Sequence, residues 1–164
     1  MTITVYRLTK LRYQNQIFSG LGGLYADGRW TFRGHPVIYT SASISLALLE
    51  YTLNYRRRGW VPASVLGRAV IPDKMRIEVV TPADLPRNWS AADSPSRLRK
   101  IGQRWLDAGA AAVLKVPSAV VVEEWNYVLN PQHPDFKKLI FQKPKRFQFD
   151  RRLARERKSK VPVR

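Results

Sequence analysis

The order of the predicted strands and helices limits the fold of this 164-residue chain more than any other feature. Helices are predicted over 44–57 and from Pro95 to a stop at Gly109. Because the strands gather at both ends of the chain instead of alternating regularly with helices, a mixed α+β domain is favoured over a doubly wound parallel sheet. Runs rich in β-branched and aromatic residues predict these strands over 2–8, 37–39, 64–71, 76–81, 111–115, 119–123 and 138–142, with 145–149 as a weaker candidate.

The first predicted helix carries apolar side chains around most of its circumference. A helix of this kind buries more than one side, so we expect it to pack against several neighbours. One side carries Ile44, Ala47, Leu48 and Tyr51, and another carries Leu46, Leu49 and Leu53.

The formal net charge of +17 is concentrated toward the C-terminal end. Residues 137–164 hold 12 of the 29 lysines and arginines, whereas residues 1–136 hold 17 basic and 10 acidic residues. We expect one domain over 1–153 and a basic tail over 154–164. Such a tail is as consistent with a solvated chain end as with binding to nucleic acid or to an acidic protein.

Several classes of protein are disfavoured by what the sequence lacks. It contains no cysteine, so disulfides, thiol nucleophiles and thiolate metal sites are excluded. It has no uninterrupted run of about 18 apolar residues and no apolar stretch behind a basic start. We therefore expect a cytoplasmic protein without a membrane span.

The glycine-rich segment 20–25 resembles a dinucleotide-binding loop only superficially. Tyr25 occupies the position of the third glycine in G-x-G-x-x-G, and no helix is predicted to begin there. If this protein binds phosphates, side chains must hold them.

Three charged residues occupy segments where a merely solvated charge is less natural. Arg7 lies within an apolar strand, Arg29 follows a glycine loop, and Glu50 lies on an otherwise apolar helix. A guanidinium group can hold two phosphate oxygens, and a carboxylate among apolar groups needs a cation or a ligand. From the residues alone, a structural ion pair explains each about as well as a binding or catalytic role.

Ser118 and the two histidines offer no complete hydrolytic or metal site. Ser118 lacks the G-x-S-x-G elbow, and its hydroxyl could contact a ligand or cap a turn. His35 and His133 each precede a proline without an acidic cluster nearby, so we predict backbone hydrogen bonds and no metal site.

Together, these segments resemble the RES domain family, named for an arginine, a glutamate and a serine. The resemblance spans nearly the whole chain, and it is the order and spacing of the motifs that make it specific. One departure is Thr31, where the family often has asparagine after Gly-Arg-Trp. The matching segments are Tyr6-Arg7-Leu8, Phe18-Ser19-Gly20, Gly28-Arg29-Trp30, Gly34, Pro36-Val37-Ile38-Tyr39, Ala47-Leu48-Leu49-Glu50, Val116-Pro117-Ser118, Glu124-Trp125-Asn126-Tyr127, Asn130-Pro131 and 147–153.

The resemblance implies a mainly antiparallel β-sheet core with flanking helices, similar to ADP-ribosyltransferase toxins. It also implies an enzyme that destroys NAD by cleaving the nicotinamide–ribose bond, through hydrolysis or phosphorolysis. The implied catalytic residues are Glu50, Arg29 and Ser118. The implied substrate-binding residues are Arg7, Arg29, Tyr39 and Ser118, with Tyr39 stacking on nicotinamide and Ser118 positioning a ribose hydroxyl or the carboxamide.

Members of this family are commonly toxins of bacterial toxin–antitoxin pairs. The resemblance therefore implies a cognate Xre-type antitoxin that covers the active site in a hetero-oligomer and makes the only DNA contact. It implies no cofactor, with NAD as substrate and inorganic phosphate as a candidate co-substrate. Two other readings stay open, namely transfer of ADP-ribose to a macromolecule and a non-enzymatic nucleic-acid-binding module.

Overall fold

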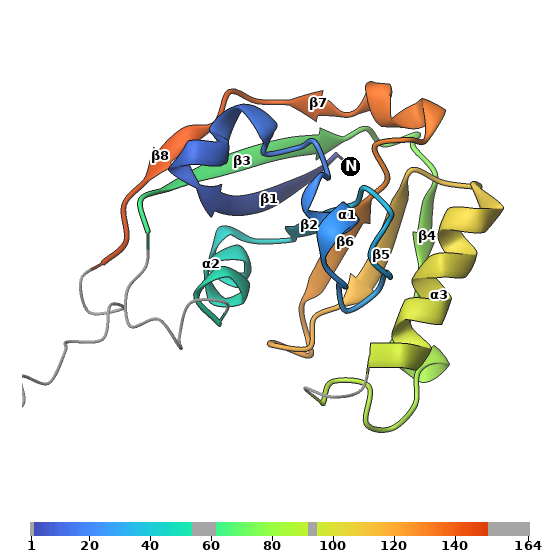
Figure 1. Cartoon of the computed structure of the whole chain (residues 1–164). Coiled ribbons are helices and arrows are strands. Elements are labelled where there is room, and N and C mark those ends of the chain that lie inside the picture. Colours follow the sequence, from blue (N-terminus) through green and yellow to red (C-terminus); the bar gives the residue numbers. More distant parts are fainter. Residues whose placement is uncertain (1, 54–61, 92–94, 151–164) are drawn as a thin grey trace, which may run out of the picture.

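One curved, eight-stranded sheet forms the centre of the protein in the computed structural model, which describes residues 2–53, 62–91 and 95–150 (Figure 1). The strand order is β4-β5-β6-β2-β1-β3-β7, and β8 also pairs with β3. Every pairing is antiparallel except that of β4 with β5. The α+β, mainly antiparallel architecture is thereby confirmed. The strands are β1 (Ile3–Lys10), β2 (Ile38–Ser41), β3 (Ser64–Ile71), β4 (Ile77–Val79), β5 (Val113–Pro117), β6 (Trp125–Leu129), β7 (Ile140–Phe141) and β8 (Lys145–Phe147).

Two longer helices flank this sheet, α2 (Ile44–Leu53) and α3 (Pro95–Ala108). Gly109 ends α3 with a φ of 55°, the left-handed conformation typical of a helix C-terminus. Residues 54–57 of the first predicted helix and Ser94 lie outside the described residues. The prediction that no helix begins in the glycine segment is wrong, because a four-residue helix, α1 (Gly22–Tyr25), forms there. Short 3-10 turns complete the chain: η1 (Leu11–Gln16), η3 (Pro82–Asp84) and η4 (Pro134–Lys138).

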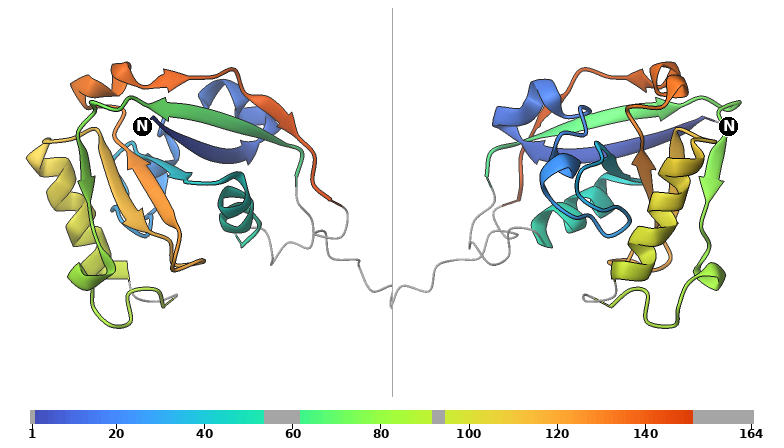
Figure 2. Two further views of the ribbon diagram at one scale, coloured as in Figure 1. Left: turned by 180° about the vertical axis from the view of Figure 1, so that it is seen from behind. Right: turned by 45° about the vertical axis from the view of Figure 1, so that its right-hand side comes forward.

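α3 lies along one face of the sheet at β4, β5 and β6 (Figure 2), and buried side chains pack on both faces. Alternation along a strand sends neighbouring side chains to opposite faces. On β6, Val128 packs in a cluster with Leu98 and Trp105 of α3, whereas Tyr127 and Leu129 pack in a second cluster with residues of β1 and β3. A third, smaller cluster joins α2 to β1 and β3 through Ala47, Tyr51, Leu8 and Leu66.

The expected packing of α2 is only partly correct. Leu46, Ala47 and Tyr51 are buried, but Leu49 and Leu53 are 45% and 43% exposed. Ala47 and Tyr51 pack against β1 and β3, whereas on the second predicted apolar side only Leu46 is buried and Leu49 and Leu53 are open to solvent.

The predicted strand over 119–123 is wrong, and the strand that follows it was missed. Residues 119–124 form bends and turns, and β6 begins only at Trp125. The hydroxyl of Ser118 accepts hydrogen bonds from the backbone N–H groups of Val120 and Val121, at 3.1 and 3.2 Å. These bonds curl the chain and override the strand propensity of the valine run.

Candidate active site

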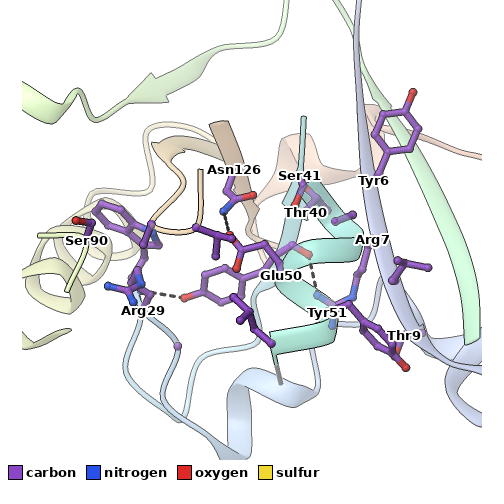
Figure 3. A pocket seen from close by; sticks show the side chains of 18 of the residues that line it. Tyr6, Arg7, Thr9, Arg29, Thr40, Ser41, Glu50, Tyr51, Ser90 and Asn126 are labelled. Atoms are coloured by element: carbon purple, nitrogen blue, oxygen red, sulfur yellow. Dashed lines mark hydrogen bonds between the residues drawn. The ribbon is translucent and has the colours of Figure 1, made fainter. Parts of the chain in front are cut away.

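A cleft of about 900 Å³ opens where β1, β2 and β6 meet α2 and the loop before Trp30 (Figure 3). The sheet order places β2 between β1 and β6, so residues far apart in sequence meet in this cleft. Four of the five predicted site residues line it, and the fifth, Ser118, does not. The polar residues of its wall are Tyr6, Arg7, Thr9, Asp27, Arg29, Tyr39, Thr40, Ser41, Glu50, Tyr51, Ser90 and Asn126.

Glu50 reaches the cleft from α2, and its carboxylate is held by two donors. Its Oε1 atom accepts a hydrogen bond from Ser118 Oγ at 3.0 Å and another from Asn126 Nδ2 at 2.7 Å. Hydrogen bonds to an ionised acceptor are stronger than those between neutral groups. The carboxylate is thus fixed in orientation by groups from outside its own helix.

Ser118 lies directly behind Glu50 and is fully buried. Its Oγ donates to Glu50 and accepts from the two valine amides of the following turn. Its backbone N–H donates to the carbonyl oxygen of Glu124 at 2.9 Å. This geometry makes Ser118 a support for Glu50, and the direct substrate contact implied by the resemblance stays a prediction.

Arg7 extends from β1 into the cleft wall as a partly buried cation. Its Nη1 donates to the backbone carbonyl oxygen of Tyr39 at 2.8 Å, and its buried Nε has no hydrogen-bond partner among the described residues. Burial lowers the pKa of Arg7 to about 10, because removing a cation from water disfavours its charged form. A partly buried guanidinium held chiefly by one carbonyl is well suited to an anionic ligand.

Arg29 is anchored by a loop distant in sequence. Its Nη1 donates to the carbonyl oxygens of Trp89, at 3.2 Å, and Ala91, at 3.0 Å. These carbonyls fix the side chain without neutralising its charge. The cleft therefore contains two arginines, Arg7 and Arg29, together with the carboxylate of Glu50.

Tyr39 fixes the loop that carries Arg29. Its Oη accepts a hydrogen bond from the backbone N–H of Trp30 at 3.1 Å and shares a second with Thr31 Oγ1 at 2.9 Å. Burial raises the pKa of the Tyr39 hydroxyl, so it stays protonated. Thr31, where the family often has asparagine, thus supplies a partner for Tyr39, and the predicted stacking of Tyr39 on nicotinamide stays a prediction.

Two glycines let this loop approach its neighbours closely. A Cβ on Gly28 would lie 2.1 Å from Tyr39 Oη, and a Cβ on Gly102 of α3 would lie 1.7 Å from the carbonyl oxygen of Trp30. Arg99 of α3 adds a hydrogen bond from its Nε to the carbonyl oxygen of Gly28, at 2.9 Å. The loop is therefore clamped between Tyr39 and a helix that does not itself line the cleft.

Substituting Gly28 with alanine should lower turnover by about tenfold. The new methyl group would force the Tyr39 ring and the Arg29 loop apart. Overpacking of this kind typically costs about 1–3 kcal/mol of stability. The measurement is the steady-state rate of the purified variant. Gly22→Ala is the matched control, since a Cβ there meets nothing within 4 Å. Equal rates for the two variants would contradict the clamp.

The histidines take no part in the cleft. His133 Nδ1 accepts from the backbone N–H of Asp135 at 3.0 Å, and its Nε2 lies 3.0 Å from the carbonyl oxygen of Gly109. These are the backbone contacts predicted for His133. Within the described ranges, no three histidine or acidic residues are grouped closely enough to hold a metal ion.

The family model described as the RES domain matches residues 4–151. The chain belongs to the RES domain family. It is 34% identical over 150 residues to a protein named Toxin Res from Yersinia enterocolitica, an alignment that covers 91% of this chain and 98% of that protein. It is 32% identical over 160 residues to one named Prs ADP-ribosylating toxin from Sphingobium, covering 95% and 99% respectively.

The fold of this RES domain is also found in a solved toxin–antitoxin complex. The matching structure is the Mycobacterium tuberculosis MbcT-MbcA complex, with a TM-score of 0.75 and 18% sequence identity. The alignment covers 90% of this chain and 85% of that one. Among the described residues, no helix is both long and apolar enough to cross a membrane.

Among the polar residues of the cleft that the sequence did not single out, Asn126 contacts Glu50. It was recognised only as part of a matching segment, and no role was assigned to it. An asparagine in a strand otherwise made of Trp125, Tyr127, Val128 and Leu129 is the signal that could have found it, since amides are depleted in strands.

Proposed function

We propose that this protein is the toxin of a toxin–antitoxin pair and that it depletes NAD in the cytoplasm by cleaving the bond between nicotinamide and ribose. The observation that carries the proposal is the cleft itself, where a carboxylate that accepts from Ser118 and Asn126 meets the partly buried cation of Arg7 and the anchored cation of Arg29. The names of the bacterial relatives support the toxin role.

The chemistry follows from the charges of the cleft. Loss of nicotinamide leaves positive charge on the ribose ring, and a carboxylate fixed beside that ring stabilises it. Glu50 takes this role and orients the attacking water or phosphate. Arg7 and Arg29 hold the pyrophosphate of NAD or an attacking phosphate, and Tyr39 packs against the nicotinamide.

The purified protein is expected to consume NAD and release free nicotinamide. Chromatography of the products, with and without inorganic phosphate, identifies the acceptor. ADP-ribose as the product indicates water, and a phosphorylated ADP-ribose formed only with phosphate indicates phosphorolysis. Absence of nicotinamide release under both conditions, from protein freed of any partner, would refute the proposal.

A second candidate function is transfer of ADP-ribose to a macromolecule. It is favoured by the name of the Sphingobium relative, Prs ADP-ribosylating toxin, which aligns over 95% of this chain. Incubation of the protein with NAD labelled in the adenine and with cell extract separates the two reactions. Label fixed on a protein or nucleic acid supports transfer, and label confined to small molecules supports degradation.

We further propose an Xre-type antitoxin that covers the cleft and makes the DNA contacts of the pair. The fold shared with a chain of a toxin–antitoxin complex supports an antitoxin partner, and the excess of positive charge would attract an acidic one. Co-expression with the product of the adjacent gene should yield a complex without NAD turnover. DNA binding by the isolated toxin, without NAD turnover, would favour the nucleic-acid-binding alternative instead.

A further inference from the structure

Asn126 lies at a rigid position in the middle of the sheet. Its backbone pairs with Ser41 of β2 on one side and with Val116 of β5 on the other. Its side chain shares the face of Val116 and Val128, which pack in the cluster beneath α3. The side chain of Asn126 lines the cleft. It extends from a strand that is paired along both edges, with β2 and with β5.

The amide of Asn126 is oriented toward Glu50 at a cost to its own hydrogen bonding. Nδ2 donates to Glu50 Oε1 at 2.7 Å, whereas Oδ1 is buried and has no hydrogen-bond partner among the described residues (Figure 3). Leaving a buried oxygen unsatisfied is unfavourable. The reverse orientation would place Oδ1 against a carboxylate oxygen, which is repulsive, so the contact with Glu50 determines the orientation of the amide.

We propose that Asn126 is a positioning residue that fixes the orientation of the Glu50 carboxylate. Ser118 supplies one donor from a turn and Asn126 supplies the other from the sheet, so Glu50 Oε1 is held from two independent elements. This inference rests on the proposed NAD-cleaving function. Asn126 acts through Glu50 and needs no contact with NAD.

Asn126→Ala should lower kcat for NAD cleavage by about 10- to 100-fold, the size expected for losing one hydrogen bond to a charged group and misorienting the carboxylate. The KM for NAD should stay within about threefold, because no substrate contact is removed. Asn130→Ala is the matched control, an asparagine just after the same strand that does not line the cleft and whose Oδ1 accepts from the backbone N–H of Gln132. It should leave kcat unchanged.

Asn126→Asp gives a signature that a structural role would not produce. Two carboxylates in this contact share one proton at lower pH, and the protonated aspartic acid then replaces the lost donor. As the pH rises, the shared proton leaves, and the two like charges repel. The rate of this variant relative to the wild type should therefore be higher at about pH 6 than at about pH 8, whereas the relative rate of Asn126→Ala should not depend on pH.

The outcomes separate this inference from the function on which it depends. If the wild type does not cleave NAD, the proposed function fails. If the wild type cleaves NAD and Glu50→Gln does not, but Asn126→Ala keeps full kcat, only the role of Asn126 is refuted. A melting temperature equal to that of Asn130→Ala shows that Asn126→Ala is folded, and a pH-independent relative rate for Asn126→Asp would overturn the proposal.

Discussion

Replacing Glu50 with glutamine is expected to lower NAD turnover by about 100-fold or more, as removal of a preorganised electrostatic group typically does. Glutamine keeps the size of the side chain, and its carbonyl oxygen can still accept from Ser118 and Asn126. The change therefore removes the negative charge while preserving the local packing. The measurement is the single-turnover rate with NAD in excess of its dissociation constant.

The matched control for this variant is Glu123→Gln. Glu123 is an exposed carboxylate in the turn before β6 and does not line the cleft. Its replacement removes the same charge nearby and should leave the rate unchanged. Undiminished turnover in Glu50→Gln would show that the carboxylate does not act on the transition state.

Replacing Arg7 with methionine is expected to reduce kcat/KM for NAD on the order of 100-fold, since a charged hydrogen-bonding group facing the ligand is lost. The same change should stabilise the fold. Removal from water lowers the pKa of Arg7 to about 10 in the folded state, so keeping this partly buried cation charged is a cost to folding. Methionine fills similar space without that cost, although the carbonyl oxygen of Tyr39 loses its side-chain donor.

The pH dependence of this gain in stability has a definite sign. Below about pH 10 Arg7 is charged in both folded and unfolded chains, so the wild type bears the whole cost and the methionine variant bears none. Above about pH 10 the folded wild type releases the proton, and the difference between the two proteins shrinks. Urea unfolding at neutral pH tests the gain, and Arg68→Met, on the neighbouring strand outside the cleft, is the control. A less stable and fully active Arg7→Met would contradict the assignment.

Elements with strong local patterns were predictable from the sequence. The segment 64–71 coincides with β3, Arg7 falls within β1 as expected, and Gly109 ends α3. The residues Arg7, Arg29, Tyr39 and Glu50 were expected in one site, and the structure brings all four to one cleft. These residues could be predicted from the order and spacing of the motifs that contain them. Each motif lies in or next to a different strand or helix.

Features that depend on contacts between distant segments were not predictable. The valine run after Ser118 has the composition of a strand. It forms a turn because the hydroxyl of Ser118 accepts hydrogen bonds from the backbone N–H groups of Val120 and Val121. The support that Ser118 and Asn126 give to Glu50 joins a turn, a strand and a helix that local patterns cannot relate. The boundary between the domain and its basic tail stays a prediction, since residues 151–164 lie outside the described part of the chain.

The position of β6 has a consequence for the timing of activity during synthesis. Arg7 belongs to the first strand of the chain, but β6 is the strand that joins β2 to β5 and carries Asn126. A nascent chain that has not yet reached residue 129 lacks this strand, so the two halves of the sheet are not connected and the cleft is incomplete. On the proposed function, a nascent chain that ends before residue 129 would lack activity, and a neutralising partner that binds before release would meet the protein before it can act.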